Sequence, residues 1–152
     1  MSEPAIINFL RYDARLTTSG QPSESQLDDI KALGVAHVIN LALHSHEQAL
    51  TDEATSVAAL GMTYTHIPVA FDNPTEADFG AFCAAMAAAG DAPVHVHCIM
   101  NWRVTAFLYR YQRDVLGMDD GHARAPMDTI WTPETHSNPS APVWAEFIAR
   151  KD

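Results

Sequence analysis

The feature that most constrains the fold is a regular alternation of short apolar strands with amphipathic helices. Predicted strands cover His37–Leu41, Met62–Ile67 and Val94–His97, and helical patterns separate them. Such repeated alternation is typical of a mainly parallel sheet with helices on both faces. We therefore predict an α/β fold of three layers, with a central sheet of about four to five strands, and a single domain over residues 1–152.

The ends of the predicted helices carry the residues that helix ends require. Ser23 and Gln26 form a capping box, and Gly34 ends the helix that follows. Thr75 caps a second helix, which Gly90 closes. These helices lie between strands, so they supply the crossovers that a parallel sheet needs.

Further segments complete the expected fold. Residues Ile6–Thr18 are expected to add one or two edge strands, and Asp52–Leu60 is an Ala-rich helix. Residues 117–142 are expected to form a long loop with at most short helices, and Pro142 to begin a terminal helix. The helix after the last strand has one apolar face, made of Val104, Phe107, Leu108, Tyr111 and Val115.

Charge and composition exclude several classes of partner. The chain has 9 Lys and Arg against 19 Asp and Glu, and its formal charge of −10 repels nucleic acid and anionic membranes. No apolar run is long enough to span a bilayer, and the N-terminus lacks a signal-peptide pattern, so we expect a cytoplasmic protein. With only two cysteines, Cys83 and Cys98, disulfides do not organise the fold.

The segment Val94–Arg103 has the clearest chemical pattern. It is predicted to be a strand, a tight loop and a helix start, with Cys98 directly after the strand. In parallel α/β sheets, ligands bind at the carboxyl ends of the strands. Loop amides and a helix N-terminus can face one anion there. The pattern therefore predicts an anion site around Cys98.

Cys98 and Arg103 have the chemistry to use such a site. A cysteine attacks phosphorus as a thiolate, and amide dipoles with a helix N-terminus favour the ionised form. The guanidinium of Arg103 is always charged and matches two phosphate oxygens at once. His97 is placed to hold the Cys98 backbone from behind.

His97-Cys98, four residues and Arg103 resemble the phosphate-binding loop of the protein tyrosine and dual-specificity phosphatases. The chain looks most like the bacterial branch known as DUF442, or beta-lactamase-hydrolase-like phosphatases, because Thr18–Pro22 and Val38–Leu41 match motifs of that branch. The resemblance covers roughly residues 10–115. It implies hydrolysis of phosphomonoesters such as phosphotyrosine, with Cys98 as nucleophile, Arg103 as phosphate clamp, and no metal or cofactor.

Carried over residue by residue, the resemblance implies a phosphate cradle made of the loop amides. The implied substrate-binding residues are His97, Ile99, Met100, Asn101, Trp102 and Thr105. The main superfamily pattern has five residues between cysteine and arginine, whereas four stand here. Asn101 replaces a loop glycine, but asparagine tolerates positive φ, so the turn remains possible. Val104 stands where a hydroxyl residue follows the arginine, and Thr105 is expected to substitute for it.

The resemblance also implies a general acid on a separate loop. Asp72 is the candidate, since it lies in the loop after a strand, 26 residues before Cys98. Its alternative role is a solvated turn residue. Weaker candidates are Asp78, Glu76 and Glu134.

Other residues with reactive side chains have plainer interpretations. Cys83 lies on the apolar stripe of its helix, which favours core packing over a redox role, and His95 is predicted to be buried in its strand. His44 and His46, with His66 as third ligand, would suit a zinc hydrolase if the fold brought them together. The alternative is a polar loop that opens the next helix.

Two other functions remain open from the sequence. The loop of a rhodanese-like sulfurtransferase also has four residues after its cysteine and then often a basic residue, and sulfur transfer needs no general acid. Alternatively, the short loop and the missing hydroxyl would leave a protein that binds phosphate, or a phosphorylated or other anionic partner, without turnover. Thr18–Pro22 and His97 favour the phosphatase.

Overall fold

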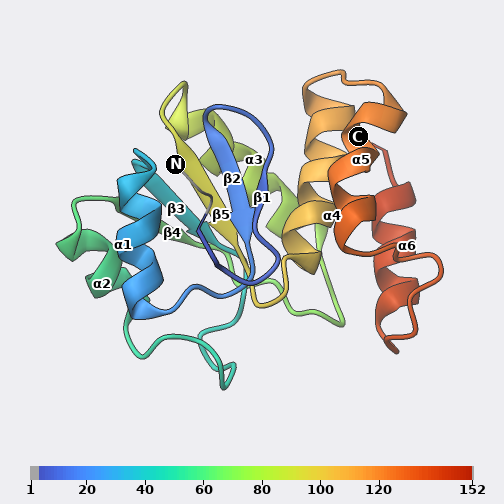
Figure 1. Cartoon of the computed structure of the whole chain (residues 1–152). Coiled ribbons are helices and arrows are strands. Elements are labelled where there is room, and N and C mark those ends of the chain that lie inside the picture. Colours follow the sequence, from blue (N-terminus) through green and yellow to red (C-terminus); the bar gives the residue numbers. More distant parts are fainter. Residues whose placement is uncertain (1–3, 152) are drawn as a thin grey trace.

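The computed structural model of the protein describes residues 4–151 and is built on a five-stranded sheet (Figure 1). The strands are β1 (Leu10–Arg11), β2 (Leu16–Ser19), β3 (His37–Asn40), β4 (Thr63–His66) and β5 (Val94–His97). The helices are α1 (Glu24–Ala32), α2 (Glu53–Ala59), α3 (Glu76–Ala89), α4 (Trp102–Arg110), α5 (Asp120–Ile130) and α6 (Ala141–Ala149). A π-helical turn, Tyr111–Val115, extends α4.

The strand order is β1-β2-β5-β3-β4, and every neighbouring pair except β1-β2 is parallel. In the centre of the sheet, Val94 of β5 pairs with Leu16 of β2 on one side and with His37 of β3 on the other. This confirms the predicted mainly parallel sheet. It also places the carboxyl ends of β2, β5 and β3 side by side, where a ligand site is expected.

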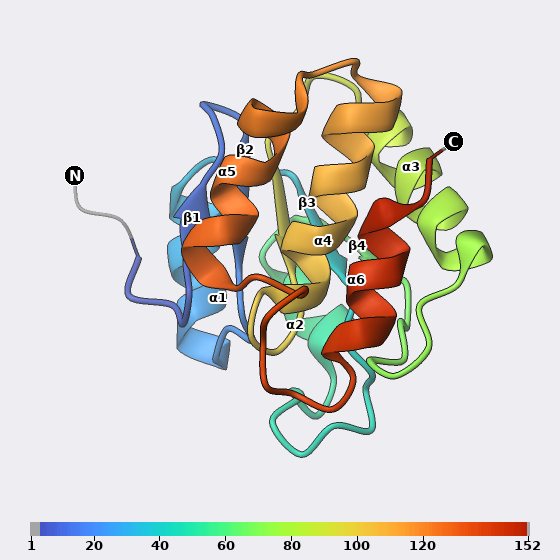
Figure 2. The same cartoon turned by 90° about the vertical axis from the view of Figure 1, so that its right-hand side faces the viewer.

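Helices cover both faces of the sheet, as predicted. One face packs against α1 and α2 through a core that includes Leu27, Val38 and Val57. The other face packs against α3 and the three C-terminal helices through a larger core that includes Phe82 and Phe107. Figure 2 shows α4 in the middle of this C-terminal layer, with α5 and α6 on either side.

The predicted helix starts are confirmed. Ser23 and Gln26 exchange the two hydrogen bonds of a capping box at α1, and Thr75 and Asp78 do the same at α3. The terminal helix α6 has proline in its first turn. These local interactions fix where each crossover begins.

Three expectations need correction. Residues 117–142 were expected to form at most short helices, but α5 within them has 11 residues. It forms despite Pro126 inside it because Asp119 caps it and because Ala123 and Met127 are buried. The strand β2 lies inside the sheet, not at its edge, because it pairs with β5. Val115 is 49% exposed, because the π-helical turn ends the regular spacing that would have kept it on the apolar face.

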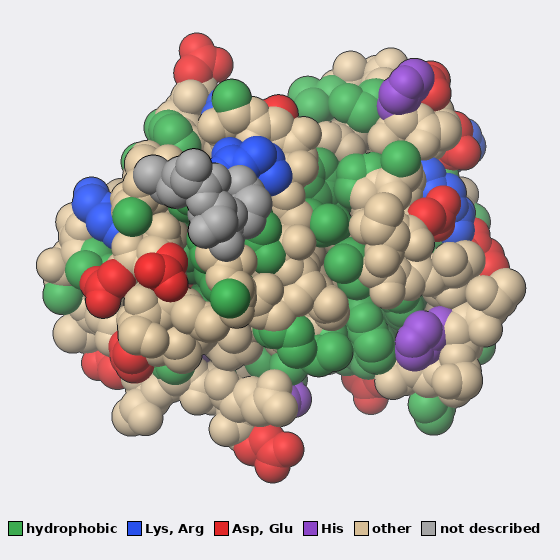
Figure 3. All heavy atoms as spheres, in the orientation of Figure 1, with side chains coloured by type: hydrophobic (Ala, Val, Ile, Leu, Met, Phe, Trp, Pro, Cys, Tyr) green, Lys and Arg blue, Asp and Glu red, His purple; other side chains and the backbone are tan. Residues whose placement is uncertain are grey.

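None of the helices between residues 4 and 151 is both long and apolar enough to cross a membrane. On the face of the molecule in Figure 3, the basic side chains lie in separate small groups. A polyanion would therefore find no continuous basic surface on that face.

Candidate active site

The carboxyl end of β5 leads through a tight loop, residues 98–101, into α4. Asn101 is the N-cap of α4 and has a φ of 66°, in the left-handed region. Asparagine enters this region more readily than most residues that carry a Cβ. The turn predicted at Asn101 therefore forms, and Cys98 lies near the N-terminus of α4.

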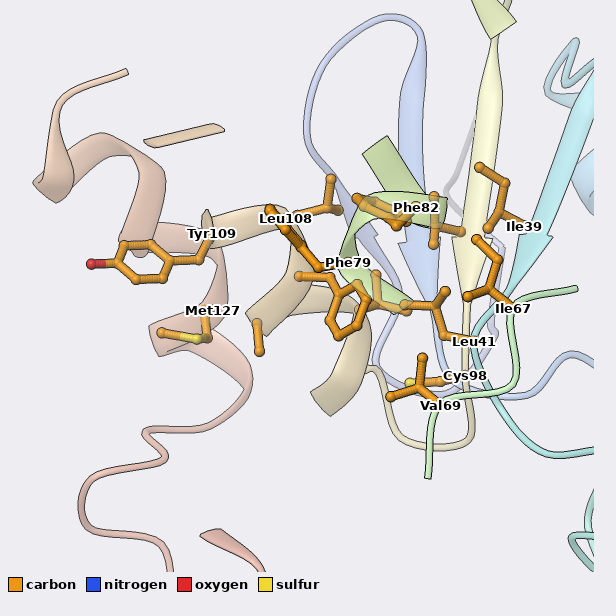
Figure 4. Close-up of a cluster of buried hydrophobic side chains, with 14 of the residues drawn as sticks. Ile39, Leu41, Ile67, Val69, Phe79, Phe82, Cys98, Leu108, Tyr109 and Met127 are labelled. Carbon is orange, nitrogen blue, oxygen red and sulfur yellow. The ribbon is translucent and has the colours of Figure 1, made fainter. Parts of the chain in front are cut away.

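A pocket of about 360 Å³ lies over this loop, and both Cys98 and Arg103 line it. The other lining residues are Leu43, Ser45, His46, Phe71, Ile99, Met100, Trp102 and Asn138. Cys98 is 1% exposed. Figure 4 shows its side chain at the end of the core, beside Val69. The thiol of Cys98 is thus shielded from bulk water.

Arg103 is held at the pocket by its surroundings. Its Nη1 donates a hydrogen bond of 2.9 Å to the carbonyl of Val69, and its guanidinium carbon lies 5.7 Å from the ring centre of Phe71. The residue is 7% exposed. A charged group with so little freedom is pre-organised to bind an anion in the pocket.

The carbonyl groups of the loop are all bound by donors that lie outside it. The His97 ring donates to the carbonyl of Cys98, the backbone amide of Gln21 to that of Ile99, and the side chain of Asn8 to that of Met100. The amide and hydroxyl of Thr105 donate to the carbonyl of Asn101, and the Trp131 indole donates to that of Trp102. These hydrogen bonds measure 2.9–3.2 Å. In a planar peptide, the N–H points away from the carbonyl of the preceding residue. The amides of residues 99–103 therefore point away from these donors.

Those five amides have no acceptor among residues 4–151. Unpaired amides are rare in a region this buried, because each loses a hydrogen bond that water would have supplied. Five consecutive ones beside a cysteine, at the N-terminus of α4, create a strong partial positive charge. The arrangement is suited to an anion with several oxygens.

The segment Thr18–Pro22 braces the loop. Nδ2 of Asn101 donates to the hydroxyl of Thr18 at 2.9 Å and to the carbonyl of Asn8 at 2.8 Å. Gly20 packs so closely that an added Cβ would lie 2.3 Å from the carbonyl oxygen of Ile99. The motif noticed in the sequence therefore supports the loop from β2 and does not line the pocket.

His97 lies behind the loop with a carboxylate partner. Its Nε2 is 2.5 Å from Oε2 of Glu53, and its Nδ1 is 3.1 Å from the carbonyl oxygen of Cys98. Gln21 donates to the other carboxylate oxygen of Glu53 at 3.1 Å. Burial raises the pKa of Glu53, but the hydrogen bonds from His97 and Gln21 together bring it below its ordinary value.

Thr105 was expected to replace a missing hydroxyl at the substrate. Thr105 lies one turn into α4, so it is fully buried and does not line the pocket. Its hydroxyl donates to the carbonyls of Asn101 and Trp102, at 2.9 and 3.1 Å. Its position supports the end of the loop. Trp102, by contrast, lines the pocket and stacks on Trp131 at 5.3 Å between ring centres.

Asp72 is exposed in the turn that follows β4, next to the pocket residue Phe71. Within residues 4–151, its carboxylate makes no hydrogen bond or ion pair. Asp72 does not itself line the pocket, and its role as general acid stays a prediction.

The weaker acid candidates are engaged elsewhere. Glu76 pairs with Arg110 and Arg150, whose hydrogen bonds lower its pKa to about 2. Glu134 pairs with Arg124, which also lowers its pKa. Asp78 closes the capping box of α3. None of these three carboxyl groups lines the pocket, and each is held by partners of its own, so they are poorly placed to give a proton to a ligand there.

The histidines do not assemble the hypothetical zinc site. His44 and His66 stack at 3.6 Å between ring centres, His44 bonds Tyr64, and His66 bonds the carbonyl of Ala42. His46 lines the pocket separately. No group of three or more metal-ligating side chains lies together within the described residues 4–151.

The two remaining predictions concern single buried residues. His95 is fully buried between the hydroxyls of Thr17 and Ser19, each 2.8 Å away, and burial holds its pKa well below the ordinary value. Cys83 packs partly buried against the main core. Both agree with the structural roles expected from the sequence.

A crystal structure of a DUF442 protein from Shewanella putrefaciens CN-32, described as a phosphatase, matches this fold with a TM-score of 0.79. The two chains are 33% identical, and the match covers 95% of this chain and 90% of the other. The chain belongs to the DUF442 family. Its five-stranded α/β architecture is therefore the one found in phosphatases of the protein tyrosine phosphatase type.

Other comparisons place this DUF442 chain more broadly. It is 37% identical over 92 residues to the beta-lactamase hydrolase-like protein of Agrobacterium fabrum, which covers 59% of the chain but about a fifth (21%) of that longer protein. A cysteine-to-serine variant of TpbA from Pseudomonas aeruginosa, bound to phosphotyrosine, has a TM-score of 0.74 at 19% identity, over 100% of this chain and 88% of the other. At this identity the likeness concerns the fold. No family model matches the chain.

Several residues of the site were not found from the sequence. Glu53 has the sequence position of an ordinary acidic residue in the first turn of a helix, and Asn8 lies in a segment that predicted only edge strands. His46 and Asn138 reach the pocket from two loops far apart in the chain. The one usable signal for Glu53 was its position after β3, whose carboxyl end lies next to that of β5.

Proposed function

We propose that the protein is a cysteine-dependent phosphatase that hydrolyses phosphomonoesters through a phosphocysteine intermediate. The observation that carries this proposal is the row of five unpaired amides, residues 99–103, between Cys98 and the fixed guanidinium of Arg103. A phosphoryl group presents three equatorial oxygens in its transition state, and such a row can donate to all of them.

In the first step, the Cys98 thiolate attacks phosphorus in line with the leaving oxygen. The S–P bond forms as the P–O bond breaks, and the electron pair of that bond stays on the leaving oxygen, which takes a proton from Asp72. The loop amides and Arg103 stabilise the charge on the three remaining oxygens. The partial positive charge at the N-terminus of α4 favours the thiolate before attack.

In the second step, water attacks the phosphocysteine. The Asp72 carboxylate accepts a proton from this water as the O–P bond forms and the S–P bond breaks, so that phosphate leaves and the Cys98 thiolate is restored. The cycle consumes one water and one ester. Every proton and electron pair is accounted for by groups of the chain, the ester and water.

The lining of the pocket favours an aromatic phosphate ester such as phosphotyrosine. The pocket has apolar surface from Phe71, Trp102, Leu43 and Met100. The permanently charged side chain among its lining residues is that of Arg103. A flat apolar leaving group can pack on these side chains. The phosphotyrosine complex of TpbA, a protein of the same fold, supports this choice.

The test is hydrolysis of para-nitrophenyl phosphate and of a phosphotyrosine peptide, in the presence of a chelator, by the wild-type chain and by Cys98→Ser. We expect hydrolysis by the wild type and none by the variant. Cys83→Ser is the matched control, since this cysteine packs on the core away from the pocket, and it should retain activity.

Three results would contradict the proposal. Hydrolysis that survives in Cys98→Ser would remove the cysteine from the mechanism. Absence of hydrolysis with both substrates, together with thiosulfate-to-cyanide sulfur transfer that depends on Cys98, would favour the sulfurtransferase instead. Phosphate binding without either reaction would favour the binding protein.

A further inference from the structure

We propose that the protein has a second binding site, at the end of the sheet opposite the Cys98 loop, which takes a free α-amino acid with an apolar side chain. A pocket of about 290 Å³ lies there, bordered by the start of β2, the end of α3 and the π-helical turn after α4. In Figure 1 these segments lie at the upper end of the sheet, and the loop after β5 lies at the lower end. The two pockets share no lining residue, so this inference stands apart from the proposed phosphatase function.

The lining of this second pocket carries charges of both signs. Asp13 and Asp91 contribute two carboxylates, and Arg15 contributes one guanidinium. A simple anion would therefore meet a lining with more negative than positive charge, on a chain whose formal charge is already −10. A ligand that carries one positive and one negative group can pair with both kinds of side chain.

Arg15 offers the pocket a donor without a partner. Its Nη2 donates to the carbonyl of Gly90 at the end of α3, which holds the side chain at the pocket. Its Nε is buried and makes no hydrogen bond, and the guanidinium forms no ion pair within residues 4–151. Oδ1 of Asp13 accepts instead from the backbone amides of Arg15 and Leu16, at 2.9 and 2.8 Å. Because a guanidinium matches the geometry of a carboxylate, Arg15 is suited to the carboxylate of a ligand.

Gln112 offers the pocket an acceptor without a partner. It lines the pocket from the π-helical turn Tyr111–Val115, and such turns are frequent at functional sites. Gln112 is 7% exposed, and its buried Oε1 accepts no hydrogen bond from any residue between 4 and 151. A buried amide oxygen without a donor is costly, because it has lost its hydrogen bonds with water. An ammonium group, which only donates, would satisfy this oxygen.

The end of α3 also favours the positive group of such a ligand. The helix ends at Ala89 and has no basic residue in its last turn, so its C-terminus carries a partial negative charge that no side chain of the helix offsets. Asp91 follows two residues later and lines the pocket, and its carboxylate makes no hydrogen bond or ion pair within the described part of the chain, 4–151. The pocket therefore attracts an ammonium group on this side and a carboxylate at Arg15.

The apolar part of the lining accounts for the side chain of the amino acid. Leu16, Met86 and Leu116 contribute to it, and Leu116 is 57% exposed. An apolar ligand side chain packed against Leu116 would remove part of this surface from water, which is favourable. The volume of about 290 Å³ lies at the small end of the range for ligand pockets, roughly 300–1,000 Å³, and so suits a ligand the size of one amino acid.

The test is NMR titration of the ¹⁵N-labelled chain with L-leucine, L-isoleucine, L-valine and L-methionine in turn. Concentrations up to about 10 mM detect dissociation constants in the millimolar range. We expect at least one of the four to shift the Arg15 Nε–H and Gln112 side-chain amide signals in a saturable way. No saturable shift of these signals with any of the four would overturn the proposal, and so would shifts confined to the backbone amides of residues 99–103.

Two analogues of the amino acid that binds test its zwitterionic character. Its carboxamide lacks the negative group, and the corresponding acid without the amine lacks the positive group. Each should bind about tenfold more weakly or worse, because a charged partner in the pocket is then left unpaired. Binding of either analogue as tight as that of the amino acid would overturn the proposal, since it would show a site for a simple cation or a simple anion.

Gln112→Met removes the acceptor and nearly keeps the volume of the side chain. We expect it to bind the amino acid about tenfold more weakly or worse. Gln48→Met is the matched control, because Gln48 is exposed in a loop outside this pocket, and it should bind like the wild type. Unchanged affinity in Gln112→Met, or an equal loss in both variants, would overturn the proposal.

The analogue comparison uses the wild-type chain, so it decides the question even if Gln112→Met does not fold. The titration needs no enzyme assay. A chain that binds an apolar amino acid but hydrolyses no phosphate ester would contradict the proposed function alone. A chain that hydrolyses the ester but binds none of the four amino acids would contradict the second site alone.

Discussion

The hydroxyl of Thr18 accepts a hydrogen bond of 2.9 Å from the side-chain amide of Asn101, across 83 residues of sequence. Thr18 lies in β2, and Asn101 ends the loop after β5, so the parallel pairing of these strands brings the two together. Asn101 also carries the left-handed turn of the loop. One side chain thus sets the backbone conformation and anchors it to the neighbouring strand.

We therefore predict that Asn101→Ala destabilises the fold by about 2–4 kcal/mol, since it adds left-handed strain and leaves buried partners unpaired. Asn101→Gly restores the turn but not the hydrogen bonds, so it should lie between the wild type and Asn101→Ala. Urea unfolding measures both. Asn73→Ala, in an exposed turn, is the control. Equal stability of Asn101→Ala and the wild type would refute the anchoring role.

Gly20→Ala tests the close approach of the brace to the loop. The new Cβ would lie 2.3 Å from the carbonyl oxygen of Ile99 and 2.5 Å from Cγ2 of Ile7, so backbone must move. We expect a loss of about 2 kcal/mol or more in the free energy of unfolding, and at least tenfold weaker phosphate binding by calorimetry, because Ile99 belongs to the cradle.

Gly80→Ala is the matched control for that substitution. Gly80 lies inside α3, and a Cβ there meets no atom within 4 Å. Alanine should stabilise the helix by about 0.5–1 kcal/mol and leave phosphate binding unchanged. If Gly20→Ala behaved like this control, the packing of the brace against the loop would not matter for the anion site.

The strands and caps could be predicted from sequence because local pattern determines them. Val94–His97 is apolar and β-branched at alternate positions, and Ser23 and Thr75 carry capping signals within three residues. Helix α5 was missed because Gly121 and Pro126 are local loop signals, whereas the burial of its other face against α4 is a tertiary effect.

The same distinction holds for the site. Cys98 and Arg103 could be named as candidates from the sequence because one short motif contains both. Glu53 and the carbonyl donors Asn8 and Trp131 come from distant segments. Only the register of the sheet and the packing of α5 bring them to the loop.

The ion pairs of Glu76 predict a pH dependence of stability. Hydrogen bonds from Arg110 and Arg150 lower its pKa from 4.5 to about 2. A carboxyl with a depressed folded-state pKa contributes stability that is present above its unfolded value and is lost as the pH falls through the folded one. The contribution should therefore disappear between about pH 4.5 and pH 2.

Urea midpoints measured at intervals from pH 2 to pH 6 would show this dependence. In Glu76→Gln, the midpoint should fall less steeply over that range than in the wild type. Because Glu76 is largely exposed, solvent screening keeps the difference small. Identical pH profiles for the two proteins would show that the pair does not couple to folding.

Asp72→Asn tests the general acid by comparing leaving groups. A poor leaving group such as an alkoxide needs a proton as the P–O bond breaks, whereas para-nitrophenolate leaves without one. We expect kcat/KM to fall by about 10²–10⁴-fold for a simple alkyl phosphate and much less for para-nitrophenyl phosphate. Because Asp72 is exposed and its carboxylate makes no hydrogen bond or ion pair within residues 4–151, the substitution should not change stability. An equal loss with both substrates would point to a role in binding. No loss with either substrate would mean that another group donates the proton, and His46, which lines the pocket, would be the next residue to test.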